Sequence, residues 1–505
     1  MSLPAIVLTG SSGFVGRHLL EAWKERYRVF GLARRSQVRS GAPTHPSITW
    51  FETDIGDRRA VEQAFARIRE QGGAELVVHL AAHYDFTGEE HPQYWRTNVE
   101  GLRHVLDACR QLRPRHFVFS SSVAACRLPP PGGVLDERSP PDGEHVYART
   151  KRQGEQMVRE YQQHFPATIV RFAALFSDWC EYPPLFKFLE TWLSSAWNAR
   201  LLGGRGESAI PYMHVKDLVL FFEHLLPRLP ELSPGEVLIA SPDGCVSHNE
   251  LYEEATRLWF GRRRPAWRMP RPLCGPGMWA RDLAGRLLGE RPFERPWMAE
   301  YIDTRMTIDA RRTRERLGWE PRQRLAVLRR LPFLLEHLKA DPLEWHTRNR
   351  AALKEARVLN NLLVHRLLEL HEEAITEEFT AVLLGPDGPR RFPSYQALTP
   401  DEHAWNHRVI LRHLTNAVRT RDKGVFLGYV RDLAERRFEQ GYRAHELCDA
   451  LRELNRICFK ILRRDRGSDG LQADMREDVT MTLQFACDLA QDVFETLEAQ
   501  AAPRA

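Results

Sequence analysis

The sequence predicts an α/β fold, built on a doubly wound parallel sheet, that is followed by a separate all-α helical bundle. A glycine-rich turn near the N-terminus joins an apolar run to an amphipathic one, and apolar and amphipathic runs then alternate along the chain. This alternation is typical of strands and helices in a parallel sheet. After Trp345, long helical runs follow one another instead, which indicates a second domain.

The glycine-rich turn covers residues 9–16, between the apolar run 5–8 and the amphipathic run 14–27. Gly10 allows a sharp turn, Gly13 leaves room for a pyrophosphate, and Gly16 lets the helix pack closely on the strand. The helix N-terminus attracts an anion. We therefore expect a loop that binds a dinucleotide, although a glycine turn also occurs in ordinary strand-to-helix connections. Its other expected cofactor contacts are Ser12, Phe14 and Val15.

The second apolar strand, 29–33, ends in Arg34 and Arg35. At this place an acidic residue binds the ribose 2′-hydroxyl of NAD, whereas an arginine accepts the 2′-phosphate of NADP. No acidic residue directly follows the strand, so we expect NADP, with NAD as the alternative if these arginines only solvate the strand end. Asp54, after the short strand 48–52, is expected to accept a hydrogen bond from the adenine amino group.

Two further strands are expected to end beside the cofactor. The apolar run 76–82 is typical of a strand covered on both faces, and the small Ala81 and Ala82 would let a cofactor lie against the backbone. The strand 116–119 leads into a cluster of three serines. Asn98 precedes a helix over 102–111 and would serve either as its N-cap or in a proton relay.

Tyr147 and Lys151 are four residues apart, so on a helix they share one face. A neighbouring ammonium group favours the phenolate form of tyrosine, and such a pair can perform general acid/base catalysis. At this spacing alone the pair would usually be a solvated helix face. Here it follows a serine cluster at a strand end in a chain that also carries a phosphate loop.

Together these motifs resemble the extended short-chain dehydrogenase/reductase family, of the NAD-dependent epimerase/dehydratase type, over about two-thirds of the chain. The resemblance implies a Rossmann-type sheet with a small substrate cap and an NAD(P)-dependent oxidoreductase. It implies that Tyr147 exchanges a proton with the substrate oxygen, that Lys151 lowers the pKa of Tyr147 and holds the nicotinamide ribose, and that Ser122 binds the same oxygen. The remaining implied cofactor contacts are Ile55, Leu80, Asn98, Ser120, Tyr147, Lys151 and Phe172.

Departures from the family pattern bear on the substrate. Val123 and Ala124 follow Ser122, where the family's dehydratases carry an Asp-Glu pair. The Asn and Gly that sugar-nucleotide epimerases usually carry after the Arg171 position are absent here. We therefore expect an apolar alcohol or ketone substrate. The alternatives are a nucleotide-sugar epimerase with tightly bound NAD, and a regulatory protein that senses a dinucleotide and signals through the helical domain.

Composition limits the classes of partner. A net charge of +5 over 505 residues, with interleaved charges, argues against a nucleic-acid partner. The eight cysteines form no Cys-x-x-Cys pair, and the first strand begins almost at the N-terminus, so we expect a cytoplasmic protein without a signal peptide. No apolar run reaches the roughly 20 residues of a transmembrane segment.

We expect a dehydrogenase/reductase domain over 1–345, with its cap mainly within 179–317, and a helical accessory or sensor-like domain over 350–505. The Pro-, Trp- and Arg-rich stretch 262–298 is interpreted as part of a cap of short helices rather than a membrane-surface segment, because no sustained amphipathic stripe is evident. The helical domain faintly resembles the N-terminal sensor domain of stressosome co-antagonist proteins and would bind a ligand or a protein partner; homodimerisation is the alternative. Its paired residues His403/His407 and Glu373/Glu377 have a metal-ligand spacing, but no metal site is expected because no Glu-x-x-His motif accompanies them.

Overall fold

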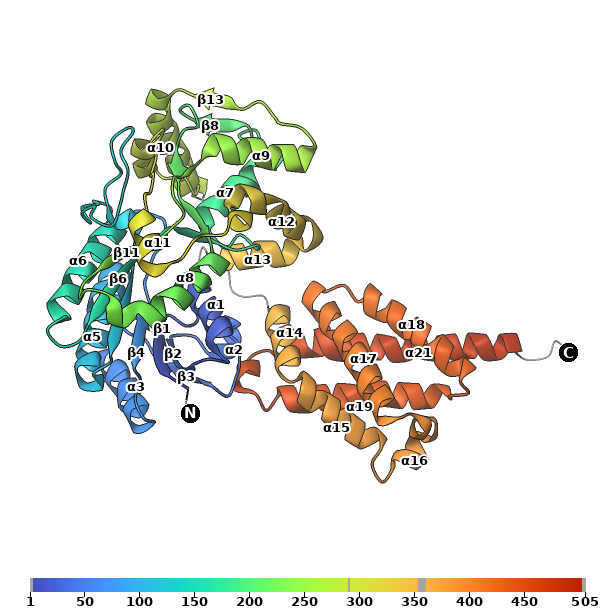
Figure 1. Cartoon of the computed structure of the whole chain (residues 1–505). Helices are drawn as coiled ribbons and strands as arrows, with labels where there is room; N and C mark the ends of the chain where they lie inside the picture. Colours follow the sequence, from blue (N-terminus) through green and yellow to red (C-terminus); the bar gives the residue numbers. More distant parts are fainter. Residues whose placement is uncertain (1–2, 289–290, 353–359, 502–505) are drawn as a thin grey trace. The chain divides into compact units, whose positions relative to one another are not determined.

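The computed structural model describes residues 3–288, 291–352 and 360–501. The chain divides into two compact units, Met1–Ala356 and Arg357–Ala505 (Figure 1). The first contains a parallel sheet with helices on both faces, and the second is helical, which confirms the predicted fold class. None of the described helices is both long and apolar enough to cross a membrane.

The sheet of the first unit has seven strands in the order β11-β6-β5-β4-β1-β2-β3, and every neighbouring pair is parallel. Its strands are β1 (Ala5–Thr9), β2 (Arg28–Ala33), β3 (Ile48–Glu52), β4 (Leu76–His79), β5 (His116–Ser122), β6 (Ala167–Phe172) and β11 (Val237–Ala240). The strand order reverses between β1 and β4, and ligands of such sheets bind at the carboxyl ends of the strands at this point.

Two apolar cores hold helices against the faces of the sheet. On one face Leu20 and Trp23 of α1 pack with Phe222 of α8, and on the other Phe65 of α3 packs with Leu102 of α5. The strands contribute to both cores, which explains their continuous apolar runs. These helices are α1 (Phe14–Trp23), α3 (Arg58–Glu70), α5 (Gly101–Leu112), α6 (Val146–Tyr161) and α8 (Val215–Arg228), with the short α2 (Gln37–Ser40) and α4 (Pro92–Trp95) between them.

The remaining elements of the first unit include the cap, which Figure 1 shows gathered at one end of the unit. They are α7 (Pro183–Trp192), α9 (His248–Phe260), α10 (Arg271–Leu288), α11 (Arg311–Leu317), α12 (Val327–Ala340), α13 (Pro342–Ala352) and the short strands β7 (Ala174–Phe176), β8 (Leu201–Gly203), β9 (Ala209–Ile210), β10 (Tyr212–His214), β12 (Val246–Ser247) and β13 (Trp267–Met269). The stretch expected to form short helices contains the 18-residue helix α10, so that expectation is wrong there.

Two predicted elements of the sheet unit are shorter in the structure. The helix expected over 14–27 ends at Trp23, and the strand expected over 76–82 ends at His79. Residues 80–81 lie directly beneath the glycine turn: a Cβ atom on Gly10 would come within 2.8 Å of the Ala81 backbone nitrogen. The end of β4 therefore supports the turn instead of extending the sheet.

The second unit consists of helices α14 (Asn360–Leu370), α15 (Glu372–Leu383), α16 (Gly388–Arg391), α17 (Pro400–Thr420), α18 (Gly424–Glu439), α19 (Ala444–Leu462), α20 (Gln472–Met475) and α21 (Met481–Ala501). Among the long helical runs that the sequence predicts after Trp345, the one over 350–384 is interrupted at His371, between α14 and α15, and residues 353–359 of it lie outside the described residues. On α19 the sequence places apolar residues at helical spacing, which predicts a bundle core, and all of them are buried: Leu447, Leu451, Leu454, Ile457, Cys458 and Ile461. His403 bonds the carbonyl of Tyr395 and His407 bonds Thr380.

Candidate active site

The predicted catalytic side chains come from neighbouring elements at the carboxyl edge of the sheet. Ser122 is the last residue of β5, and Tyr147 and Lys151 lie one turn apart on α6. The Ser122 hydroxyl lies near that of Tyr147 and acts to lower the pKa of the Tyr147 phenol. Ser122 and Tyr147 remain partly exposed, whereas Lys151 is buried. A proton could therefore pass between Tyr147 and a ligand that lies at the edge of the sheet.

Burial raises the pKa of the Tyr147 phenol well above its ordinary value, and the nearby Ser122 hydroxyl opposes this shift only partly. Tyr84 stacks on Tyr147, with ring centroids 4.2 Å apart, and accounts for part of the burial. The Lys151 Nζ atom lies 5.6 Å from the Tyr147 ring centroid. In this geometry Tyr147 is a protonated group that can donate, and the expected lowering of its pKa by Lys151 is not seen.

Lys151 is held by the strand beside it. Its Nζ atom donates a 2.6 Å hydrogen bond to the backbone carbonyl of Ser120. Burial lowers the pKa of Lys151 to about 8, although the Glu155 carboxylate on the same helix opposes the shift. Glu155 is itself neutralised by a buried two-pronged ion pair with Arg171, at 2.9 Å for both bonds. Lys151 therefore carries a positive charge that is only weakly compensated by the protein.

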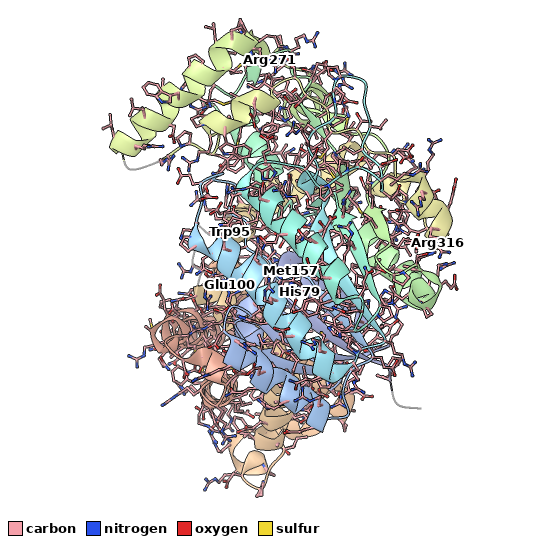
Figure 2. All side chains as sticks on the ribbon, turned by 90° about the vertical axis from the view of Figure 1, so that its left-hand side faces the viewer. His79, Trp95, Glu100, Met157, Arg271 and Arg316 are labelled. Atoms are coloured by element: carbon pink, nitrogen blue, oxygen red, sulfur yellow. The ribbon has the colours of Figure 1, made fainter. Side chains whose placement is uncertain are left out.

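Asn98 is buried inside a helical segment, so its expected role as an N-cap is wrong. Residues Arg96–Glu100 form a π-helical turn that joins α4 to α5 without a break, and Figure 2 labels Trp95, just before this turn, and Glu100, its last residue. The Asn98 amide accepts a 2.6 Å bond from the backbone N–H of His83 and donates to Thr150 at 3.0 Å. Asn98 thus connects the chain after β4 with the helix that carries Tyr147.

The glycine turn has the shape of a phosphate cradle. A Cβ atom on Gly16 would lie 2.4 Å from the Gly10 carbonyl oxygen, so the helix can approach the turn this closely only with glycine there. Gly13 is the N-cap of α1 and makes no capping bond through a side chain, and the first turn of that described helix carries no acidic residue. Its N-terminus, with Ser12, Phe14 and Val15 partly exposed, is suited to an anion.

Three guanidinium groups lie near this turn. Arg35 donates a 2.8 Å bond to the backbone carbonyl of Ser12. Burial lowers the pKa of Arg35, and the positive charges of Arg17 and Arg34 add to the effect. Arg17 is paired with the buried Glu181 at 3.2 Å. The mutual repulsion of these cations would be relieved by a bound phosphate.

The other expected cofactor contacts surround the same edge. Burial alone would raise the pKa of Asp54, but bonds from Arg96 and from the Gly56 backbone N–H hold it below its usual value. Ile55 and Ser120 are buried, and Leu80, Ala81 and Phe172 are partly exposed. Ala82 is exposed and follows β4 in the loop that leads to Tyr84.

An aromatic cluster beside Tyr147 was not predicted from the sequence. Phe86 lies 4.0 Å from Tyr84 between ring centroids and contacts Tyr182 and Phe293 at about 6 Å. All of these rings keep partial exposure. Tyr84 and Phe86 follow β4, whereas Tyr182 and Phe293 come from residues far along the chain, so only the aromatic pair after the strand could have been noticed in the sequence.

Parts of this chain are similar in sequence to known proteins. Residues 6–240 match the model of the NAD dependent epimerase/dehydratase family. The chain is 26% identical over 290 residues to N-acetyl-alpha-D-glucosaminyl-diphospho-ditrans,octacis-undecaprenol 4-epimerase of Escherichia coli O157:H7. This alignment covers 57% of this chain and 81% of that protein. This chain is 23% identical over 369 residues to 3beta-hydroxysteroid-dehydrogenase/decarboxylase isoform 1 of Arabidopsis thaliana. That alignment covers 66% of this chain and 80% of the plant protein.

Solved structures share the fold of the first unit. UDP-glucose 4-epimerase of Thermotoga maritima with UDP-glucose has a TM-score of 0.51 at 21% identity, covering 66% of this chain and 98% of its own. UDP-glucose 4-epimerase of Thermus thermophilus in complex with NAD has a TM-score of 0.51 at 20% identity, covering 67% and 99%. These likenesses confirm the Rossmann-type architecture.

Proposed function

We propose that this chain, whose residues 6–240 match the model of the NAD dependent epimerase/dehydratase family, is an oxidoreductase that interconverts an apolar alcohol and ketone. The glycine cradle, the uncapped N-terminus of α1 and the nearby arginines fit a dinucleotide. The nicotinamide of that cofactor, when bound, gives or takes the hydride. The protein supplies orientation and the proton.

Tyr147 moves the proton. Because burial raises the pKa of its phenol, the hydroxyl is protonated at neutral pH and suited to donate to the oxygen of a ketone that is being reduced. Ser122 holds the same oxygen through its hydroxyl. The buried ammonium of Lys151 binds the nicotinamide ribose and stabilises negative charge on Tyr147 after the proton has left. In the oxidation direction the same groups act in reverse order.

The aromatic cluster carries the proposal of an apolar substrate. Tyr84, Phe86, Tyr182 and Phe293 present partly exposed rings beside the Tyr147 hydroxyl. A surface of this kind binds hydrocarbon or planar groups through buried area and ring contacts. A sugar hydroxyl against these rings would lose its hydrogen bonds to water.

We propose NADP as the preferred cofactor. Arg34 and Arg35 follow β2 without an acidic residue, and Arg35 is already held against the glycine turn by its bond to Ser12. A 2′-phosphate beside them would form charge-assisted hydrogen bonds that NAD cannot form.

A second candidate is an epimerase that oxidises and re-reduces its substrate on a retained NAD. The observation that favours it is the similarity to the undecaprenol-linked 4-epimerase, 81% of which aligns with this chain. This candidate predicts NAD that remains bound through purification and no net change in oxidation state.

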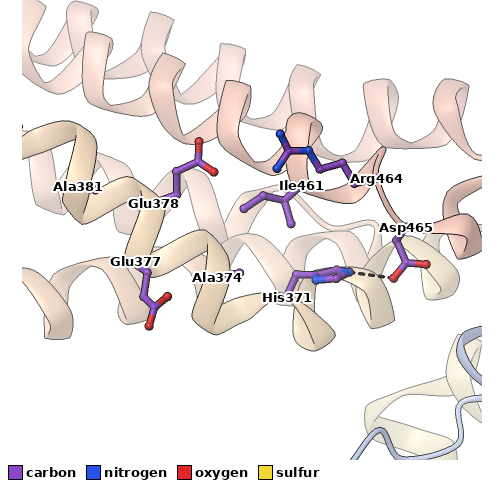
Figure 3. Close-up of a pocket in the computed structure, with 8 residues that line it drawn as sticks. All are labelled: His371, Ala374, Glu377, Glu378, Ala381, Ile461, Arg464 and Asp465. Atoms are coloured by element: carbon purple, nitrogen blue, oxygen red, sulfur yellow. Dashed lines mark hydrogen bonds and ion pairs between the residues drawn. The ribbon is translucent and has the colours of Figure 1, made fainter.

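We propose that the helical unit is an accessory domain that binds a signal or a partner. Its groove beside α15 and the end of α19 is lined by His371, Glu377, Glu378, Arg464 and Asp465 together with Ala374, Ala381 and Ile461, and this lining supports a ligand with both apolar and charged parts (Figure 3). His371 and Asp465 are paired there at 2.9 Å.

The test begins with the nucleotide that denaturation releases from the purified protein, followed by titration of the stripped protein with NADPH and NADH. Preferred, exchangeable NADPH binding and turnover of apolar ketones would support the reductase. Tyr147→Phe should then lose turnover while retaining NADPH binding. Tyr161→Phe is the matched control, because Tyr161 lies on the same helix and its hydroxyl bonds Asp107. Tightly held NAD with turnover of a UDP-sugar, and none of ketones, would overturn the proposal in favour of the epimerase.

A further inference from the structure

Helix α10 of the cap directs its large apolar side chains outward. Leu273 is 58% exposed, Trp279 60%, Leu283 44% and Leu287 81%. By helical spacing these four residues form one continuous stripe, and the exposed residues between them on that face are alanine and proline. The expectation that this stretch carries no sustained apolar stripe is therefore wrong, because α10 is long enough to display one.

The side of α10 that faces the protein is small or charged. Cys274 and Gly285 are buried there, together with Asp282, which is 3% exposed. Asp282 is paired with Arg291 and Arg295, each at 2.8 Å. Ion pairs and close backbone packing thus hold the helix in place, and its hydrophobic side chains are left for another surface.

Charge surrounds the stripe on both sides. Arg281 and Arg286 are exposed at its two edges by helical position. Residues 261–300 contain nine arginines and four acidic residues, an excess of five that equals the net charge of the entire chain. In Figure 2 the helix begins at the labelled Arg271 and runs along the outside of the unit. Arginines flanking a Trp- and Leu-rich face are typical of helices that lie on anionic membranes.

The helix is connected to the proposed substrate site. It packs on the 3-10 helix Pro296–Tyr301. From that element the Trp297 indole donates a 2.8 Å bond to the Thr87 carbonyl, one residue after Phe86 of the aromatic cluster. Phe293, just before the same element, contacts Phe86 directly. The helix that carries the stripe is therefore connected to the aromatic cluster through residues 293–301.

We propose that α10 docks the protein on the surface of an anionic lipid bilayer, with Trp279, Leu283 and Leu287 inserted among the acyl chains and the flanking arginines at the headgroups. The docking does not depend on the proposed reaction. If that reaction is correct, docking places the aromatic cluster where it can receive an apolar substrate from the lipid phase.

The test is co-sedimentation of the full chain with vesicles of phosphatidylcholine and phosphatidylglycerol, and with vesicles of phosphatidylcholine alone. We expect binding to the anionic vesicles that weakens with added salt. Leu283→Glu combined with Leu287→Glu should lower the vesicle affinity at least about tenfold. Trp405→Glu is the matched control, because Trp405 is 67% exposed on α17 of the other unit and should leave binding unchanged.

The milder Leu287→Ala and Trp279→Ala guard against a folding defect, because both side chains are exposed and each should weaken binding by a smaller factor. NADPH titration of each variant measures the first unit separately, so a failure of the reaction and a failure of docking are distinguished. Absence of vesicle binding, or equal loss in Trp405→Glu, would overturn the proposal. So would a dimer in solution that the stripe variants convert to monomer, because a second copy would then cover the stripe.

Discussion

The two units bury polar side chains in different ways. In the sheet unit Ser122, Tyr147 and Lys151 come together at one edge, and Ser122 and Tyr147 stay partly exposed. In the helical unit His403 and His407 are buried and bond neighbouring segments of the bundle. A polar group that meets both protein and solvent can perform chemistry, whereas one that is enclosed by helices contributes to packing. The comparison predicts that substitutions change turnover in the first unit and stability in the second.

The largest effect is expected from Tyr147→Phe. Loss of the hydroxyl should lower kcat/KM by about 10²–10⁴-fold, because the proton transfer loses its donor. His407→Ala, in the bundle, should leave kcat/KM unchanged and lower the free energy of unfolding by about 1–3 kcal/mol, because the bond between the His407 ring and Thr380 and the packing of the buried ring are lost. Steady-state kinetics and chemical denaturation measure the two effects. Equal losses of turnover in both variants would break the comparison.

Glu155→Gln should have the largest effect on stability. Glu155 is fully buried, accepts two bonds from Arg171 and a third from Ser121 at 2.7 Å, and its neutralisation leaves a buried guanidinium without a counter-charge. The expected loss is about 3–5 kcal/mol in the free energy of unfolding. Arg437→Gln in the bundle is the counterpart. Arg437 donates to the hydroxyl of Tyr442, which is a neutral partner, so this substitution should lower the free energy of unfolding by less than Glu155→Gln does. A smaller loss for Glu155→Gln than for Arg437→Gln would contradict this ranking.

Stability should depend on pH in different windows for the two units. Burial lowers the pKa of Lys151 to about 8 from 10.5, so the unfolded chain binds the extra proton between these values. The free energy of unfolding of the wild type is therefore highest above pH 10.5, where Lys151 is neutral in both states, and decreases as the pH falls from 10.5 to 8. Relative to Lys151→Met, which has no such group, the decrease should be about 3 kcal/mol. Burial lowers the pKa of His407 to about 4 from 6.5, so its contribution is lost between pH 6.5 and 4. Unfolding curves of wild type, Lys151→Met and His407→Gln across pH measure both windows; identical pH profiles would refute the assignment.

Cofactor should stabilise only one unit. If the units unfold separately, calorimetry will show two transitions, and NADPH at a hundred times its Kd should stabilise the first unit by about 2.7 kcal/mol. The transition of the helical unit should stay in place. A shift of both transitions would indicate coupling between the units and would favour the regulatory interpretation.

The smallest effect concerns the choice of cofactor. Arg35→Ala should reduce the preference for NADPH over NADH by about tenfold, because one charge-assisted bond to the 2′-phosphate is lost. Arg412→Ala, an arginine of the bundle, is the matched control. Fluorescence titration with both nucleotides measures the ratio, and an unchanged ratio in Arg35→Ala would mean that Arg35 only supports the glycine turn through Ser12.

The sequence alone determined the features that depend on local spacing. The glycine turn, the alternation of strands and helices, the Tyr147–Lys151 spacing and the buried stripe of α19 follow from periodicity and from glycine's conformational freedom, which neighbouring residues largely decide. The family resemblance rested on these same motifs, and the match of residues 6–240 confirms it.

Only the tertiary structure decided what distant residues do to one another. Tyr84 stacks on Tyr147, whose pKa is raised by burial, Asn98 bonds His83 and Thr150 instead of capping a helix, and Phe293 joins Phe86 across about two hundred residues of sequence. The outward stripe of α10 depends likewise on which face the protein covers. Burial and ion pairing are set by contacts across the fold, and a linear pattern of residue types does not contain those contacts.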